Sequence, residues 1–324
     1  MPSNAIATRD WQTIVERLHA RQCVPFLGAG VNASSDDYEG LPLGAQVALR
    51  LAADLVTTDV AEFDDLAKVE VLNEALREYP QLLRLELHDL ARVAFHLERA
   101  VDNPHLMQIV RNVLADEGRV PSELLTTLAR LPVRLIVTTN YDRLMEKALE
   151  EAGREYVPVV QPIGGFHPLE LASKDEELAD AKAGGILILY KIHGSFQANG
   201  QAPAERIIIT EEDYIEFLTV VANEQIGIPP TIKAEMTTGT LLFLGYSLED
   251  WDFRTIFKGT IEKLERHEIF KSFAIQKQPS AFWSKFWEKE KNVVIYDMDL
   301  HDFAVELKKR YAEHTAKAGA GDGG

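Results

Sequence analysis

VPFLGAGVNASS, residues 24–35, joins a short apolar run to a turn that contains two glycines. Val24 to Leu27 form an unbroken apolar segment, which is typical of a strand buried on both faces. The turn that follows, Gly28-Ala29-Gly30-Val31-Asn32-Ala33, fits G-x-G-x-x-(G/A), the pattern of strand-to-helix turns that present backbone N–H groups to a pyrophosphate. A single match of this kind also describes an ordinary tight turn, so the rest of the chain decides its meaning.

Short apolar runs of the same type recur after Pro132, and helical patterns such as YDRLMEKALEEAG (141–153) and DYIEFLTVVANEQ (213–225) separate several of them. The runs are LIVTTN (135–140), ILILYKI (186–192), IIIT (207–210), LLFLGYS (241–247), FAIQ (273–276) and NVVIY (292–296). Continuous rather than alternating apolar runs predict strands covered on both faces. We therefore expect an α/β protein with a Rossmann-like parallel sheet sandwiched by helices.

Residues 45–130 have a different pattern, rich in Leu, Ala, Glu and Arg at helical spacing. The sequence thus predicts an inserted all-helical module at 45–130. The Rossmann-like domain would comprise residues 1–44 and 131–312, and residues 313–324 would form a flexible tail. The helical module is either an oligomerisation or docking surface or a lid packed on the sheet, and its sequence favours neither.

Charge and composition argue against several classes of function. The net charge is −17, from 34 basic and 51 acidic residues, and no basic run offsets it, so we expect no direct nucleic-acid binding. No apolar run is long enough to span a membrane and MPSNAIATRD does not resemble a signal peptide, so we expect a cytoplasmic protein. Cys23 is the only cysteine, which excludes an internal disulfide and a cysteine-based zinc site.

A dehydrogenase of the Rossmann type would end its second strand in an acidic residue about 20 positions after the glycine turn. Asp54 has roughly that spacing, but it lies within a helical pattern. Hydride transfer therefore loses support as a function.

Polar side chains follow the predicted strands at the points where the strands end. Asn140 and Asp142 follow LIVTT, His193-Gly194-Ser195 follows ILILYKI, and Gly245-Tyr246-Ser247 follows LLFL. In open α/β sheets, ligands bind outside the carboxyl ends of the strands. A histidine titrates near neutral pH and accepts protons, and a neighbouring glycine permits close approach of a ligand.

Each of these strand ends also has a purely structural interpretation. Asn140 could cap the following helix while Asp142 complements the helix dipole, and this is the simpler reading of the two residues taken alone. His193 could be a histidine hydrogen-bonded at a strand end, and Gly245 to Ser247 an ordinary turn. These alternatives stay open on spacing alone.

Taken together, the segments resemble the sirtuin family. Four motifs occur in the family's order: GAGVNASS (28–35), TTNYD (138–142), KIHGS (191–195) and GYS (245–247). The resemblance covers about residues 20–300, although the stretch 45–130 carries no matching motif. It implies a Rossmann-like domain that binds NAD, with the motif histidine as a base near the nicotinamide ribose and the motif asparagine and aspartate on the nicotinamide side.

The resemblance also implies roles for single residues. Asn140 would position the attacking water or the ribose, His193 would be the base toward the ribose hydroxyl or that water, and Asp142 would hold the carboxamide or stabilise positive charge. The residues predicted to contact NAD+ are Gly28, Ala29, Gly30, Asn32, Ser34, Thr139, Gly194, Gly245 and Ser247.

One departure from the family narrows the expected reaction. Deacylase sirtuins carry four zinc-binding cysteines, whereas this sequence has one cysteine, so we expect no metal. The segments LYKIHGS and FLGYSLEDWDF look more like bacterial sirtuin-like effector domains of anti-phage defence. That branch implies an NAD+ glycohydrolase, which cleaves its substrate NAD+ to nicotinamide and ADP-ribose and so depletes the infected cell in abortive infection.

An NAD+ hydrolase that is always active would poison its host. The resemblance therefore implies control by homo-oligomerisation or by a partner, such as a HerA-type ATPase or helicase-like protein or another defence-system sensor. Two alternatives remain open: an NAD-dependent protein deacylase without the zinc module, and a noncatalytic subunit that senses NAD or ADP-ribose.

Overall fold

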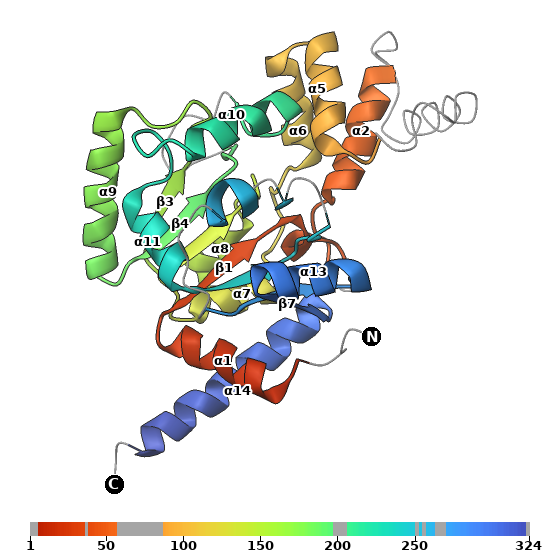
Figure 1. The fold of residues 1–324 in the computed structure, drawn as a ribbon. Helices are drawn as coiled ribbons and strands as arrows, with labels where there is room; N and C mark the ends of the chain where they lie inside the picture. The colour runs from red at the N-terminus through yellow and green to blue at the C-terminus, as the bar shows by residue number, and fades with distance from the viewer. Residues whose placement is uncertain are drawn as a thin grey trace.

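The computed structural model describes residues 6–35, 38–56, 87–196, 206–249, 253–254, 257–262 and 270–321. A seven-stranded sheet with the order β3-β4-β2-β1-β5-β6-β7 lies at its centre (Figure 1). Its strands are β1 (Cys23–Leu27), β2 (Leu135–Thr138), β3 (Tyr156–Val160), β4 (Leu187–Lys191), β5 (Thr240–Leu244), β6 (Ser272–Gln276) and β7 (Val293–Asp297). Every neighbouring pair is parallel, which confirms the predicted sheet and brings all strand ends to one edge.

Helices cover both faces of the sheet (Figure 1). One layer contains α1 (Thr8–His19), α7 (Glu123–Arg130), α8 (Leu144–Glu151) and α14 (Leu300–Gly321); the other contains α9 (Pro168–Ala183), α10 (Glu211–Val221), α11 (Pro230–Thr238), the short helix η2 (Phe257–Ile261) and α13 (Ala281–Lys291). Side chains of β1 alternate between the layers: Val24 and Phe26 join one core, and Cys23 and Leu27 join the other. Burial on both faces explains why the strand is continuously apolar.

Two strand assignments from the sequence differ from the structure. IIIT (207–210) is buried but forms no strand, because Thr210 and Asp213 make a capping box that starts α10 at Glu211. Conversely, β3 was not predicted; it is an only partly buried strand that contains Pro158. β3 lies at the edge of the sheet and pairs only with β4, where a residue without an N–H group is tolerated.

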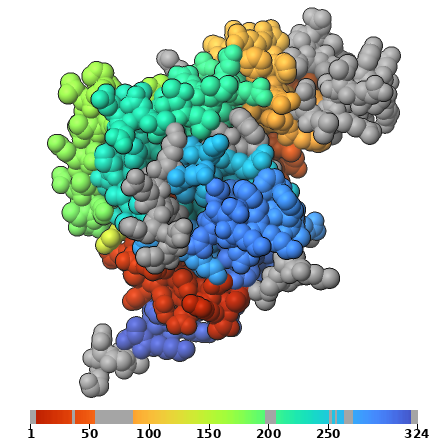
Figure 2. Space-filling view, viewed as in Figure 1, coloured from red at the N-terminus to blue at the C-terminus, as the bar shows by residue number. Residues whose placement is uncertain are grey.

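The predicted helical module is present in part. Its described helices are α2 (Gly44–Val56), α5 (Leu90–Ala100) and α6 (Asn103–Val113), and they share a separate hydrophobic core. Asp54 lies within α2, as its helical pattern indicates, and residues 57–86 fall outside the described residues. Figure 2 shows α5 and α6 as a protruding lobe beside α10.

Two segment boundaries in the structure differ from those that the sequence predicts. α7 falls inside the stretch 45–130, yet it packs against α8 and α14 in the layer beneath the sheet. α14 continues through residues 313–321, where the sequence predicts a flexible tail. The separate helical core therefore involves α2, α5 and α6 rather than the whole stretch.

The turns after β1 and β5 interlock at the centre of the sheet. The amide of Gly28 donates to the Leu244 carbonyl and that of Gly30 to the Gly245 carbonyl, both at 2.9 Å. A Cβ atom on Gly28 would lie 2.7 Å from the carbonyl oxygen of Gly245. Gly245 has a φ of +77°, and a Cβ atom there would collide with the amide nitrogen of Val31. The glycines of both motifs therefore let two backbones touch.

We expect Gly245→Ala to lower the free energy of unfolding by about 2 kcal/mol or more, because it adds a backbone collision to the cost of a positive φ. Gly153→Ala is the matched control: Gly153 has a φ of +64° with nothing near its Cβ position, so only the conformational cost of about 1 kcal/mol remains. Urea unfolding measures both. Equal losses in the two variants would show that the turns separate at little cost.

Candidate functional site

The four sirtuin-like motifs lie side by side along the carboxyl edge of the sheet. Strands β4, β2, β1 and β5 are consecutive neighbours, and each is followed by one motif. Neighbouring strands are spaced about 4.8 Å apart, so the four exits line a continuous edge about 14 Å long. Strands β2 to β4 lie on one side of β1, and strands β5 to β7 lie on the other side. The sheet therefore has its topological switch point between β1 and β5, which is the position where open α/β sheets bind ligands.

The carbonyl of Leu27, the last residue of β1, connects three of these exits. It accepts hydrogen bonds from the Thr139 amide at 3.1 Å, the Thr138 hydroxyl at 3.1 Å and the Tyr246 hydroxyl at 3.0 Å. The hydroxyls of Thr139 and Tyr246 are also 3.2 Å apart. Thr139, which was predicted to contact NAD+, thus helps to fix the ends of β2 and β5 against β1.

Asn140 does not cap the helix that follows β2. Its side-chain Nδ2 donates to the Gly28 carbonyl at 3.2 Å, and its backbone amide donates to the Thr138 hydroxyl at 3.0 Å. The amide of Leu144 in α8 instead donates to Oδ1 of Asp142 at 2.9 Å. The capping interpretation is therefore wrong for Asn140, whose half-buried side chain lies against the glycine turn.

Asp142 and Asn32 meet across the site, although 110 positions separate them in sequence. Asn32 Nδ2 donates to Oδ2 of Asp142 at 2.8 Å. Oδ1 of Asn32 is buried and has no hydrogen-bond partner among the described residues. Burial raises the pKa of the Asp142 carboxyl, and the charge of Lys191 partly offsets this effect. Asp142 therefore orients Asn32, and the carboxamide of Asn32 keeps one free acceptor.

Sequence reasoning missed the ion pair beneath this site. Lys191 and Glu146 are 1% and 3% exposed, and their Nζ and Oε1 atoms lie 2.9 Å apart. Lys191 also donates to the backbone carbonyl of Asp142, which anchors the loop after β2. A lysine inside a central strand was the available signal, since a buried lysine requires a partner.

His193 is almost completely buried, at 2% exposure. Its ring meets Tyr214 and Phe217 of α10 edge-on, with centroids 5.2 and 5.6 Å away. Nε2 has no hydrogen-bond partner among the described residues, so the hydrogen-bonded alternative is not supported at this atom. Burial lowers the pKa of His193 to about 3, and the ring is therefore neutral at physiological pH.

Gly194 and Ser195, which follow His193, contact other segments of the protein. Gly194 has a φ of +89°, and its Cβ position faces Ile207 at 3.3 Å. The Ser195 hydroxyl donates to the Tyr141 carbonyl at 3.3 Å. Among the other predicted residues, Ala29 and Ser34 are exposed, and Ser247 is half-buried. Contact of these residues with NAD+ stays a prediction.

The glycine turn does not open an α-helix. Ala29–Asn32 forms a four-residue 3₁₀ helix, and α2 begins only at Gly44. The amides of Gly28, Gly30, Val31 and Ala33 all donate to backbone carbonyls, so in this conformation they are not directed at a pyrophosphate. The side chain of Asn32 is the polar group that the turn directs into the site.

A cavity of about 130 Å³ adjoins the site at Asp142. Its wall is formed by Arg111, residues 114–117, residues 141–143 and Phe196. It therefore lies between the helical module and the loop after β2, which makes the module part of the site's surroundings.

The described residues include no cluster of three or more His, Cys, Asp or Glu side chains arranged to hold a metal ion. Within the same part of the chain, no helix combines the length and the apolar character needed to cross a bilayer. Cys23 is buried in β1, and burial raises the pKa of its thiol to about 12, so the thiol stays protonated at neutral pH.

Comparison with known proteins identifies relatives of this arrangement. The SIR2-like domain family matches residues 134–295, half of the chain. A protein named NAD(+) hydrolase ThsA from Cytobacillus dafuensis is 27% identical over 244 residues, which are 75% of this chain and 38% of that protein. A protein of the same name from Bacillus cereus (strain MSX-D12) is 28% identical over 185 residues, covering 55% of this chain and 34% of the relative.

The chain thus spans little more than a third of the length of the curated relatives it matches. A solved structure titled as the basis for the mechanism and regulation of Sir2 enzymes covers 96% of this chain and all of its own, with 12% identity and a TM-score of 0.44. A likeness at that level adds nothing to the fold described above.

The burial of His193 predicts a dependence of stability on pH. The unfolded chain protonates this ring near pH 6.5 and the folded protein only near pH 3, so between these values the unfolded state binds more protons and stability falls as the pH falls. Lowering the pH from 7.5 to 5.5 should cost the parent about 1.4 kcal/mol more than it costs His193→Gln, as measured by urea unfolding. Equal losses would mean that the ring titrates normally when folded.

Proposed function

Because the chain belongs to the SIR2-like domain family, we propose that it hydrolyses NAD+ to nicotinamide and ADP-ribose. One observation carries the proposal: two buried polar atoms without partners among the described residues, His193 Nε2 and Asn32 Oδ1, belong to motifs on the edge of the sheet where ligands bind. The curated relatives named NAD(+) hydrolase support the same reaction.

In the proposed reaction, the bond between ribose C1′ and the nicotinamide nitrogen breaks and the oxygen of water bonds to C1′. Nicotinamide leaves as a neutral molecule, and the water gives up a proton. Positive charge develops on the ribose ring as the bond breaks, so the site must orient water and supply negative potential. The Asp142 carboxylate and the carboxamide oxygen of Asn32 are the groups we assign to that potential.

His193 is the proposed base, and its neutral ring retains the lone pair that accepts a proton. A pKa of about 3 makes it a weak base while α10 buries it. Contact with water or with substrate hydroxyls would return the pKa toward its ordinary value near 6.5. We therefore propose that the base becomes competent only when α10 and residues 206–210 move away from the ring.

Asn140 is assigned to position the attacking water or the ribose. Its Nδ2 is held by the Gly28 carbonyl, which fixes the orientation of the side chain beside the glycine turn. The other proposed NAD+ contacts are Gly28, Ala29, Gly30, Asn32, Ser34, Thr139, Gly194, Gly245 and Ser247. We propose that residues 45–130 are an insertion into the Rossmann-like domain of residues 1–44 and 131–312, with α7 of the insertion packed on that domain.

We expect His193→Ala and Asn140→Ala to lower NAD+ turnover by about 100-fold or more, since each removes a group that acts in the transition state. Nicotinamide release from NAD+ measures the rate. His301→Ala, which changes an exposed histidine on α14, is the matched control and should keep the parental rate. If both site variants consumed NAD+ as fast as a clearly active parent, the assignment would be wrong.

The two alternative functions give different results in related assays. NAD+ loss that requires an acyl-lysine peptide would favour a deacylase, whereas peptide-independent loss favours hydrolysis. NAD+ or ADP-ribose binding without turnover, even in an assembled complex, would favour a noncatalytic sensor.

We further propose a defence role in which assembly or a partner controls NAD+ depletion. The helical module is placed to transmit such control, because α5 joins α10 through ion pairs: Arg92 with Glu211 at 3.0 Å and Arg99 with Glu212 at 2.7 Å. α10 in turn covers His193. A HerA-type ATPase or another sensor could act through the same surface, as could a second copy of the chain.

Light scattering of the purified chain should detect a homo-oligomer of at least twice the mass of the chain. Nicotinamide release per chain should rise with protein concentration over the range in which the oligomer forms, because assembly is proposed to expose His193. A monomer at high concentration would remove the oligomerisation proposal and leave control by a partner.

A further inference from the structure

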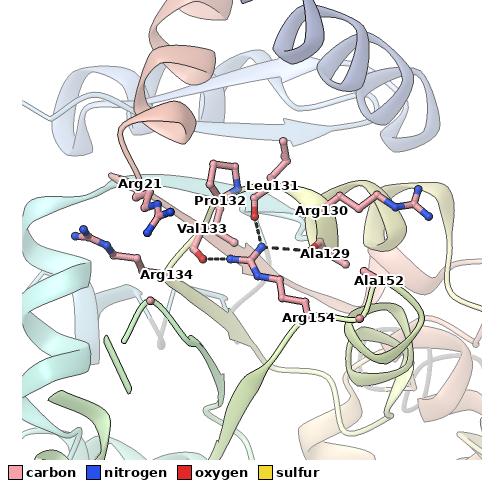
Figure 3. A pocket seen from close by; sticks show the side chains of 11 residues that line it. Arg21, Ala129, Arg130, Leu131, Pro132, Val133, Arg134, Ala152 and Arg154 are labelled. Atoms are coloured by element: carbon pink, nitrogen blue, oxygen red, sulfur yellow. Dashed lines mark hydrogen bonds between the residues drawn. The ribbon is translucent and has the colours of Figure 1, made fainter. Parts of the chain in front are cut away.

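A second cavity, of about 460 Å³, opens at the opposite edge of the sheet (Figure 3). Its wall is formed where the chain enters the strands: Arg21 precedes β1, residues 129–134 precede β2, residues 152–154 precede β3 and Gly185 precedes β4. The strands are five residues long or less, so about 16 Å of sheet separates this cavity from the proposed NAD+ site. No motif of the sirtuin resemblance reaches it.

All the charged side chains that line this cavity are positive. It contains Arg21, Arg130, Arg134 and Arg154 and no acidic residue, although the chain carries a net charge of −17. None of the four arginines forms an ion pair within the described ranges. Figure 3 shows Arg21 and Arg134 on one side of the cavity and Arg130 extending away on the other side.

Arg154 shapes the wall of the cavity. Its guanidinium donates to the carbonyls of Ala129, Leu131 and Val133, which end α7 and lead into β2 (Figure 3). These hydrogen bonds satisfy N–H groups of Arg154, but the backbone carbonyls do not neutralise its positive charge. Burial, and to a smaller extent the charge of Arg21, lowers the pKa of Arg154. The charges of Arg21 and Arg154 therefore repel each other across the cavity.

Arg134 adds an unsatisfied donor. Its Nε is buried and has no hydrogen-bond partner among the described residues. Guanidinium groups match phosphate oxygens in geometry and charge, and an anion bound here would relieve the repulsion among the arginines. A cavity of this volume accommodates a small molecule rather than a folded domain.

We propose that this cavity binds a small molecule with a chain of phosphates, held by Arg21 and Arg134 while Arg154 fixes the surrounding backbone. The site is separate from the proposed NAD+ site and does not depend on it. Inorganic polyphosphate and nucleoside polyphosphates share the chemistry that the arginines recognise.

Titration calorimetry on the full chain tests the proposal with two probes, inorganic tripolyphosphate and ATP. The parent should bind one equivalent, and Arg21→Gln/Arg134→Gln should weaken binding at least tenfold. Lys285→Gln/Lys289→Gln removes the same charge from exposed positions of α13 and should bind as the parent does. Binding of both probes assigns the site to the phosphate chain itself, and binding of ATP alone assigns it to nucleoside polyphosphates.

Four results would overturn the proposal, three of them from calorimetry. The first is a parent that binds neither probe, and the second is equal binding by the parent and the cavity variant. The third is loss of binding in His193→Ala, which would place the phosphates in the catalytic site. If light scattering showed instead that the cavity variant only dissociates an oligomer, the arginines would belong to a protein interface and not to a phosphate site.

Discussion

The close contact between the turns after β1 and β5 is the constraint on which the site depends. Gly28 and Gly245 approach so closely that neither position has room for a Cβ atom. The contact lies at the topological switch point between β1 and β5. Beside it, the Leu27 carbonyl accepts hydrogen bonds from residues at the ends of β2 and β5. Three separate strand ends are thereby held at fixed distances before any ligand is considered.

This constraint changes what the glycine motif does. A G-x-G turn is usually interpreted as a phosphate cradle made of backbone amides. Here four of those amides are used within the protein, and the glycines serve close packing of backbone on backbone. Polar groups for a ligand come instead from side chains, namely Asn32, held by Asp142, and Asn140, held by the Gly28 carbonyl.

The second property of the site is that its proposed base is hidden. α10 packs two aromatic rings against His193, and α5 of the helical module is tied to α10 by surface ion pairs. Exposed pairs contribute little stability each, so this connection is easily rearranged. In the proposed reaction, the cover that α10 forms over this neutral histidine would keep the base inactive until the module moves α10.

The sequence by itself determined the sheet and the set of motifs. Unbroken apolar runs predicted six of the seven strands and their burial on both faces, because burial on two sides leaves no polar positions in a strand. Local pattern misjudged β3, a partly buried edge strand that contains Pro158, and IIIT, which is apolar because it is buried near His193. Tertiary structure alone decided which polar groups are paired and which are buried. Residues distant in sequence form the hydrogen bond of Asn32 with Asp142 and the ion pair of Lys191 with Glu146, and they bury His193. Hydrogen bonding and desolvation depend on distance in space, and a linear pattern does not contain that distance.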